Sequence, residues 1–521
     1  MKIILRVILG ISAFIVVIMV LTTFVAEPWA RNKIETAFNE NSVDYRLKIG
    51  RVHISILRSA IELEDITLFS IRQHNSIPDF KGEIKSVHLL GINLSKALFK
   101  SDIIVNQVDI SNSRIIGKIP LHKKGIAPKI SSINIRIDSL FVDKLGIELK
   151  DSSTAMAYSI KDGVLKIFDF QIEKQDTFST AILKKFDFDA QELQMVLSDS
   201  MYTFTGTGIN YSTISKILSA SNFSIHPNYN TSDFASLHEF QSDRIEADLN
   251  AMHISNFSIP EYFNSGALKS SYVEIGEMEI NVFRDKNKPF RHVKKPTFQE
   301  MIYNFPGTIN IDSLGILAGN IAYTEHAEKA KEPGTLKFND LIAKLHKVTN
   351  DTLYKTEKAF LELKSEALLM GKGKIVVALK AELFNVQNTF TVDGSLSKME
   401  ISDLNPFLEN NAFIYATAGT IDNMTFSFEA NNTKSSGKMS MLYHDLDIAV
   451  KNKQTNDTTG VKAWFITLIA NKAIMNSNPI PGEQVRIGII DKERDPERFL
   501  FNYCAKSIIS GIKTSLSKNN K

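Results

Sequence analysis

The sequence predicts a mainly β protein with one N-terminal transmembrane helix and short amphipathic helices near its C-terminus. Three observations support this prediction. Apolar and polar residues alternate with a period of two through most of the 521 residues, as in strands with one solvated face. One apolar run is long enough to cross a bilayer. Helical periodicity is confined to short segments and to the residues after 460.

The apolar run Val7–Ala26 predicts the transmembrane helix. About 20 residues rising ~1.5 Å each cross a hydrocarbon core ~30 Å thick. Lys2 and Arg6 precede the run, which places residues 1–6 in the cytoplasm and the rest of the chain outside it. The alternative is a cleaved signal peptide, but Phe24 is too large for the −3 position of a cleavage site after Ala26. We therefore expect an uncleaved anchor over residues 7–26.

Residues 27–44 are expected to form a helix at the membrane interface. Pro28 suits the first turn of a helix, and Trp29 suits the boundary between lipid and water. Ile34, Ala37 and Phe38 fall on one helical face.

The alternation of apolar and polar residues over residues 45–460 predicts a continuous series of strands, on the order of 25 to 30 in all. Gly50 marks a shift in the alternation, as at a β-bulge. Turns are expected at Asp162-Gly163, at Asp393-Gly394 and over 371–373. Within this body, helices are expected only as short inserts, such as 212–219 and 404–410.

Two short sequences recur. The residues Ile135-Arg-Ile-Asp-Ser-Leu140 return as Ile309-Asn-Ile-Asp-Ser-Leu314, and Ser221-Asn-Phe-Ser-Ile225 returns as Ser255-Asn-Phe-Ser-Ile259. Together with the uniform strand pattern, they favour an array of repeated β units that stack on their neighbours.

Residues 461–521 differ from the body. Val461, Trp464, Phe465 and Leu468 lie on one face of a first predicted helix. A second helix places its apolar side at Phe501, Ala505, Ile508, Ile512 and Leu516. Two interpretations stay open: the helices cap the end of the sheet, or they contact a membrane or a partner through their lysines.

The sequence contains no recognisable catalytic or metal-binding motif, so we expect neither an enzyme nor a cofactor. The single cysteine, Cys504, excludes an internal disulfide framework and any site built from several cysteines. The 11 histidines lack metal-ligand spacing. A net charge of +3 spread along the chain gives no indication of nucleic-acid binding. Hydrophobic residues at 43% and charged residues at 23% are typical of a folded chain.

The chain resembles the AsmA-like proteins of Gram-negative envelopes, in particular those of Bacteroidota-type bacteria. The resemblance begins with the N-terminal anchor followed by YRLKIGRVHISILRSAIELEDITL at Tyr45–Leu68. It covers nearly the whole chain and contains no catalytic residue. Its further motifs are NVFRDKNKPF at Asn281–Phe290, INIDSLGILAGNIAYTEHAE at Ile309–Glu328, GTLKFNDLIAKLHKVTND at Gly334–Asp351, ISDLNPFLE at Ile401–Glu409, SSGKMSMLYHDLDIAV at Ser435–Val450 and the segment Arg494–Gly511.

The resemblance implies an elongated, twisted, antiparallel β-groove built from repeated strands, with an apolar interior. It implies an inner-membrane protein whose bulk lies in the periplasm and which carries phospholipid between the two membranes in support of outer-membrane biogenesis. The C-terminus is then expected to contact an outer-membrane protein or the membrane surface. The predicted lining residues of the groove are Ile54, Ile56, Ile61, Leu63, Ile135, Ile137, Ile309, Ile311, Ile375, Val377, Leu379, Phe390, Val392, Phe426 and Phe428.

Two other functions stay open. One is an anchored scaffold for outer-membrane assembly that carries no lipid. The other is an envelope enzyme with an unrecognised site. A continuous apolar trough favours transport, a filled core favours a scaffold, and converging carboxylates or histidines favour an enzyme.

Overall fold

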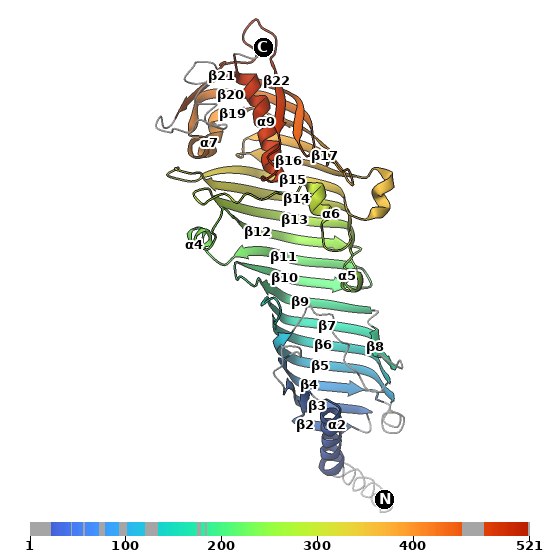
Figure 1. The fold of residues 1–521 in the computed structure, drawn as a ribbon. Helices are drawn as coiled ribbons and strands as arrows, with labels where there is room; N and C mark the ends of the chain where they lie inside the picture. Colours follow the sequence, from blue (N-terminus) through green and yellow to red (C-terminus); the bar gives the residue numbers. More distant parts are fainter. Residues whose placement is uncertain are drawn as a thin grey trace, which may run out of the picture. The chain divides into compact units, whose positions relative to one another are not determined.

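The computed structural model describes residues 22–42, 44–55, 58–71, 79–92, 102–119, 134–174, 179–182, 185–450 and 474–518. The predicted mainly β fold with few helices is confirmed (Figure 1). Within these residues, no helix is long and apolar enough to cross a membrane. Most of the predicted anchor and the helix predicted from Val461 to Leu468 lie outside the described residues.

The chain divides into two compact units, Met1–Ser221 and Asn222–Lys521. Unit 1 begins with the short π-helix η1 (Thr22–Ala26), which continues into α2 (Glu27–Asn41) and so confirms the helix predicted there. Its strands are β1 (Tyr45–Lys48), β2 (Arg51–Ser55), β3 (Ala60–Ser70), β4 (Asp79–Leu90), β5 (Asp102–Ile119), β6 (Asn134–Asp151), β7 (Ala157–Lys174), β8 (Ser179–Ile182), β9 (Lys185–Val196) and β10 (Tyr202–Ser212); β11 (Ile217–Pro227) contains the boundary.

The strands of unit 1 pair nearly in chain order. Both β1 and β2 pair with β3, and the ladder continues through β4, β5, β6, β7, β9 and β10. Strand β8 pairs with one end of β7. Every pair is antiparallel except β5–β6, which is parallel.

Unit 2 follows the same plan. The strands from β12 to β18 pair in order, then β18 and β19 pair with β20, followed by β21 and β22. Its strands are β12 (Asp243–Ser255), β13 (Leu268–Asp285), β14 (Ile309–His326), β15 (Gly334–Thr349), β16 (Phe360–Leu369), β17 (Gly373–Glu382), β18 (Phe390–Leu396), β19 (Met399–Glu400), β20 (Ile414–Ala430), β21 (Lys434–Val450) and β22 (Ile487–Glu493). Its helices are α4 (Thr231–Ser236), α5 (Ile259–Ser265), α6 (Phe298–Tyr303), η2 (Thr352–Glu357), η3 (Ile401–Leu404), α7 (Asn405–Asn411) and α9 (Leu500–Leu516).

The first recurring sequence is a structural repeat. Its copies begin β6 and β14, and these are the second strands of the two parallel pairs, β5–β6 and β13–β14. In each unit the following strand, β7 or β15, returns antiparallel. The second recurring sequence is not a structural repeat, because one copy lies in β11 while the other leaves β12 and enters α5.

Three local predictions are wrong. Residues 212–219 form a turn and the start of β11 rather than a helix. Asp162-Gly163 lies inside β7, where Asp162 has a φ of 48° and kinks the strand instead of ending it. Asp393-Gly394 lies inside β18, where Gly394 leaves room for the Phe426 ring. The predicted turn over 371–373 and the helix over 404–410 are confirmed, as β16–β17 and α7.

The described residues form 22 strands, fewer than expected, because several strands run for 18 residues. A strand of that length rises roughly 60 Å. The strands of each unit are thus longer, and fewer, than the spacing of the alternating runs predicts.

Helix α2 covers the exposed edge formed by β1 and β2. Glu35 Oε1 accepts a hydrogen bond from the Ile49 amide at 2.6 Å, and Glu27 Oε1 accepts one from the Ile54 amide at 3.0 Å. Asn39 bonds both the amide and the carbonyl of Leu47, at 2.8 and 3.1 Å. Side chains of the helix therefore take the place of a neighbouring strand, which protects the edge from pairing with another chain.

We expect Glu35→Ala to weaken this edge, because the Ile49 amide loses its acceptor. A buried donor left without a partner costs about 1–3 kcal/mol. Hydrogen exchange of the Ile49 amide should therefore quicken, with a matching fall in the free energy of unfolding of unit 1. Glu40→Ala, at an exposed position of the same helix, is the control and should change neither quantity. Unchanged exchange at Ile49 in Glu35→Ala would show that the edge is held by other contacts.

The last strand, β22, is protected in the same way by α9. Thr514 Oγ1 accepts from the Ile489 amide at 2.7 Å and donates to the Ile489 carbonyl at 3.0 Å. Ser510 Oγ accepts from the Asp491 amide at 3.2 Å. This contact supports the capping interpretation of the C-terminal helix.

The buried face of α9 agrees with the predicted one in part, because Leu516 is buried and Ile508 and Ile512 pack against the core. Tyr503, Ser507, Gly511 and Ser515 are buried, whereas Phe501 is 60% exposed. The small residues allow the helix to approach the sheet closely. Ser507 Oγ lies 2.7 Å from Ser435 Oγ of β21. The periodicity of large apolar residues could not identify the part of this face that Ser507, Gly511 and Ser515 form.

Candidate functional site

The long strands of unit 1 change their side-chain phase near the middle. Asp65, Asn112 and Asp169 have φ values of 52°, 52° and 55°, in the left-handed region that Asp and Asn tolerate better than most residues. Because the alternation is interrupted there, Leu63 and Ile66 lie on one face and pack in one cluster, although they are three residues apart. Each kink thus keeps the apolar residues of a long strand on a single face.

Two rows of apolar side chains cross unit 1 from strand to strand on that face. We call this surface the N-terminal apolar face. The first row joins Val52, Leu63, Val87, Ile110, Val142, Leu165, Phe188 and Tyr211, each paired with the next. The second row joins Ile54, Ile61, Leu89, Val108, Leu140, Ile167 and Phe186.

The opposite face of the same strands is mostly polar, with the Phe141–Phe168 ring pair as an apolar exception. Between the two rows run Glu62, His88, Asp109, Phe141, Lys166 and Asp187. His88 Nε2 lies 2.9 Å from Glu62 Oε1, and both side chains are partly exposed. The sheet of unit 1 therefore separates a solvated face from an apolar one.

Much of the N-terminal apolar face is only partly covered. Leu63, Val87, Ile110, Leu165 and Phe188 keep part of their surface exposed. Five other residues of the two rows are buried, at most 8% exposed: Val52, Val108, Val142, Ile167 and Tyr211. The two clusters of buried residues in unit 1 hold three residues each. Among the described residues of this unit, α2 follows η1 as the second helix, and it packs against β1 and β2. An open hollow of about 760 Å³ lies at the strand ends, where Phe80, Leu149 and Tyr158 lie beside Lys118 and Lys150.

The corresponding face of unit 2 is closed over its later strands, β17 to β21. One row joins Leu314, Leu345, Leu363, Leu379, Val392 and Phe428. From β17 onward these side chains belong to a cluster of 24 buried residues, in which Phe390, Val392, Phe426 and Phe428 are at most 3% exposed. Leu345 and Leu363 are partly buried and pack against it. Leu500, Tyr503 and Leu516 of α9 complete this cluster. Side chains of the protein itself therefore fill the space over these strands.

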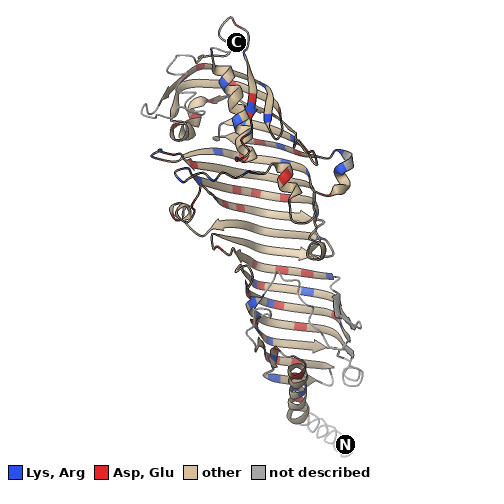
Figure 2. Cartoon of the chain, in the orientation of Figure 1, with Lys and Arg blue, Asp and Glu red and all other residues tan. Residues whose placement is uncertain are grey.

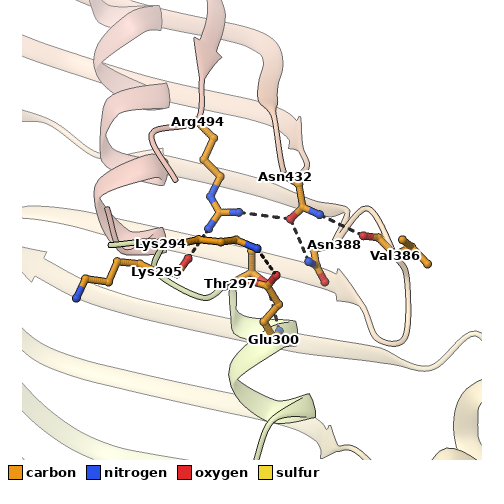
Figure 3. A network of polar contacts seen from close by, with 8 residues as sticks. All are labelled: Lys294, Lys295, Thr297, Glu300, Val386, Asn388, Asn432 and Arg494. Carbon is orange, nitrogen blue, oxygen red and sulfur yellow. Dashed lines mark hydrogen bonds and ion pairs between the residues drawn. The ribbon is translucent and has the colours of Figure 1, made fainter. Parts of the chain in front are cut away.

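A crossover strap, residues 286–308 with α6, also covers the core of unit 2. Phe298 and Ile302 of α6 pack against the buried cluster. Figure 3 shows how the strap is held at the turn between β22 and α9. Arg494 Nη2 donates to the Lys295 carbonyl at 2.9 Å, and the Lys295 amide donates to the Pro496 carbonyl at 2.8 Å. The Arg494 side chain also reaches Asn432 Oδ1 at 3.4 Å.

A charged network ends the apolar face of unit 2. Arg284 on β13 makes two hydrogen bonds to the Asp243 carboxylate on β12, at 2.6 and 2.5 Å. Glu325 on β14 lies 2.6 Å from Lys286 Nζ and accepts from the Tyr323 hydroxyl at 2.8 Å. Burial, together with the Glu325 charge, raises the pKa of Tyr323, so this hydroxyl stays protonated and donates. The network satisfies its own charges.

The structure brings the predicted lining residues together in separate groups. Ile54, Ile61 and Leu63 lie in one cluster of unit 1, and Ile135 and Ile137 lie in the other. Ile309 and Ile311 begin β14, where Ile311 pairs with Val348. Ile375 and Val377 pack against the core of unit 2, and Leu379, Phe390, Val392, Phe426 and Phe428 lie within it. Ile56 lies outside the described residues. That any of them contact lipid stays a prediction.

Sequence reasoning missed most of the N-terminal apolar face, including Val87, Val142, Leu165 and Phe188. The kinks shift the alternation by one residue, so the sequence of each long strand has the pattern of two separate short strands. A usable signal was present: two alternating runs, out of phase by one residue, on either side of an Asp, Asn or Lys.

The described residues include no group of His, Cys, Asp and Glu side chains arranged to hold a metal ion. Burial raises the pKa of the Cys504 thiol to about 12, far from the range in which a thiolate nucleophile forms at neutral pH. Comparison with known proteins found no matching family model and no matching curated protein.

Proposed function

We propose that this chain is an AsmA-like, membrane-anchored periplasmic protein that carries phospholipid by its acyl chains on the N-terminal apolar face. The carrying observation is the pair of unbroken apolar rows across unit 1. An acyl chain laid on this face removes apolar surface from water on both partners, at about 25 cal/mol per Å². Such transfer needs no acid, base or metal, and it supports outer-membrane biogenesis.

The position of α2 favours a lipid path that begins at the membrane. The proposed anchor, residues 7–26, leads directly into α2, where Trp29 is 55% exposed. Ala30 and Ile34 of the same helix pack with Leu47 and Ile54, where the apolar face starts. With the anchor in the inner membrane and its N-terminus in the cytoplasm, this face starts next to the outer leaflet.

The closed core limits the proposed path. Strands β16 to β22 and α9 leave no free apolar surface for an acyl chain among the buried cluster. We therefore confine the lipid path to unit 1 and assign the end of unit 2 a structural role.

Photo-crosslinking from one face and then the other tests the proposal. Phe188 lies on the apolar face between Leu165 and Tyr211, while Phe141 lies on the polar face between Asp109 and Lys166. Benzoylphenylalanine at either position replaces an aromatic residue by a related one. In cells, we expect phospholipid adducts from position 188 and at least tenfold fewer from position 141. Equal yields, or none from position 188, would contradict lipid carriage.

A scaffold that carries no lipid is the second candidate, and the filled core of unit 2 favours it. On the outer side of this core, Val485, Ile487 and Ile489 are 41%, 46% and 48% exposed. The scaffold predicts that position 188 crosslinks to no lipid, while position 487 crosslinks to an outer-membrane assembly protein.

A further inference from the structure

The crossover strap begins with a run of positive charge. Residues 286–295 contain five lysines and arginines and no aspartate or glutamate, in a chain that has 61 lysines and arginines against 58 acidic residues. Arg291, His292, Val293 and Lys294 follow one another at exposed positions, and Val293 is 37% exposed. Figure 2 shows the lysines and arginines of this segment in blue, between β13 and α6. The first half of the strap therefore presents cations to the solvent.

The turn between β22 and α9, with the first residues of α9, adds exposed aromatic rings. Phe499 is 41% exposed and Phe501 is 60% exposed. Lys295 Nζ of the strap lies 4.8 Å from the centre of the Phe499 ring, and His292 Nδ1 lies 2.9 Å from Glu497 Oε2. These contacts join the strap and the turn into one surface. We call it the basic aromatic surface, made of residues 288–295 and 497–501.

The carboxylates of the strap and of the turn each have a cationic partner. Glu300 of the strap lies 3.1 Å from Lys294 Nζ. On the turn, Asp495 lies 3.7 Å from Arg498, and Glu497 is the residue that pairs with the strap histidine. The negative charges of this region are therefore offset within it.

Three cations of the strap have no such partner. Among the described residues, Lys288, Arg291 and Lys295 form no ion pair with a carboxylate. Arg291 lies instead over the Phe240 ring at 5.9 Å, as Lys295 lies over Phe499. A ring attracts a cation but carries no net charge, so the surface keeps an excess of positive charge beside its exposed rings.

We infer that the basic aromatic surface binds an anionic membrane surface. Lysine and arginine side chains are attracted to anionic headgroups, and aromatic rings favour the boundary between lipid and water. A bilayer combines anionic groups with an apolar layer beneath them, which suits cations beside the exposed side chains of Val293, Phe499 and Phe501. An acidic protein matches the cations but provides no such layer. The inference concerns unit 2 and does not rest on the proposed carriage of lipid by unit 1.

Vesicle binding by the full chain tests the inference. The chain is reconstituted in phosphatidylcholine nanodiscs, and the probes are vesicles of phosphatidylcholine alone or of an equal mixture of phosphatidylcholine and phosphatidylglycerol. The test variant combines Lys288→Gln, Arg291→Gln and Lys295→Gln, which leaves the backbone hydrogen bonds of the strap in place. We expect the wild type to bind the mixed vesicles and not those of phosphatidylcholine alone. The triple variant should bind the mixed vesicles at least tenfold more weakly.

The matched control removes three lysines elsewhere in unit 2, through Lys372→Gln, Lys398→Gln and Lys438→Gln. These lysines are exposed, and the control should bind mixed vesicles as the wild type does. A triple variant of the strap that binds like the wild type, or a control that loses binding equally, overturns the inference. A wild type that ignores the mixed vesicles also overturns it, and its binding to polyglutamate would then identify an acidic protein as the partner.

A fluorescent label at position 293 shows whether the strap itself meets the vesicle. Val293→Cys places a reactive thiol on the exposed strap, whereas Cys504 packs against the core and its burial raises the pKa of the thiol to about 12. An environment-sensitive dye at position 293 should brighten with mixed vesicles, and the same dye attached through Lys438→Cys should not. No change at position 293, or an equal change at position 438, contradicts the inference. A failure of lipid crosslinking at position 188 leaves these results unaffected, so the two proposals fail separately.

Discussion

Replacing Leu379 by aspartate is expected to unfold unit 2, whereas replacing Leu165 by aspartate is expected to leave unit 1 folded. Leu379 is 6% exposed and lies inside the cluster of 24 buried residues. A lone charge there has no partner and no access to water, which costs several kcal/mol. Because a domain is stable by only about 5–15 kcal/mol, Leu379→Asp should abolish the cooperative unfolding of unit 2.

Leu165 occupies the equivalent kind of position on the N-terminal apolar face, but it is partly exposed. An aspartate there can keep contact with water, so the cost of its charge is smaller. It should, however, repel acyl chains from the first apolar row. We expect Leu165→Asp to retain its circular-dichroism spectrum and protease resistance, and to reduce the co-purifying phospholipid severalfold.

This contrast corrects the sequence-based expectation for unit 2. If Leu379 lined an open groove, as the sequence predicts, Leu379→Asp would block lipid while sparing the fold, since an open groove admits water. The core found around Leu379 removes that possibility. Lys380→Gln is the matched control, because Lys380 is exposed on the opposite face of β17 and pairs with Glu362 at 3.0 Å. If Leu165→Asp unfolds as completely as Leu379→Asp, the face of unit 1 is also a closed core and carriage is contradicted.

The class of fold could be predicted because alternation is a local property of each strand. Ile375, Val377 and Leu379 read as a strand in isolation, and they form one. Which strands pair, and in which direction, depends on residues far apart in the sequence, so the parallel pairs β5–β6 and β13–β14 were not predicted. Their presence was nevertheless marked by the recurring sequence at Ile135 and Ile309, which begins the same strand in each unit.

Openness could not be predicted from alternation at all. Phe428 and Leu63 have the same pattern of neighbours in the sequence, yet one is sealed and the other partly exposed. The difference comes from α9 and the crossover strap. Helix α9 packs on the sheet through Ser507 and Gly511, and Arg494 holds the strap through the Lys295 carbonyl. Small and polar residues carry no apolar periodicity, so their contact becomes visible only once the chain is folded.

The same contact explains why removing the C-terminus cannot test lipid delivery. If the body carries lipid to its C-terminal end, deleting residues 461–521 is expected to abolish transport-linked function even if the remaining body folds and binds lipid. However, Ile490 is fully buried, and Leu500, Tyr503 and Leu516 lie in the core. Deletion removes part of the core itself, so loss of function would follow from loss of structure. A single substitution that detaches α9 is a more specific test.

Replacing Gly488 by valine is expected to displace α9 from the sheet. A Cβ atom at this position would lie 2.3 Å from Ser515 Oγ and 2.4 Å from the Gly511 carbonyl oxygen. The carbonyl belongs to the helix backbone and cannot turn aside, so the helix must move. Overpacking costs about 1–3 kcal/mol, and exposing Leu500, Tyr503 and Leu516 adds to this. We expect the free energy of unfolding to fall by roughly 3–6 kcal/mol.

The single cysteine reports directly on this displacement. Cys504 lies on α9 against the core, and its burial raises the pKa of the thiol to about 12. Wild-type protein should therefore react slowly with a maleimide at neutral pH, because the thiolate is scarce and shielded. In Gly488→Val the exposed helix should be labelled at least tenfold faster. Ile489→Ala is the control, since the neighbouring Ile489 side chain is 48% exposed and points away from the helix. Labelling of Gly488→Val at the wild-type rate would mean that the sheet yields and α9 stays in place.

The N-terminal apolar face lies in the other unit. We therefore expect Gly488→Val to keep its lipid adducts at position 188, which separates the structural role of α9 from the proposed carriage of lipid.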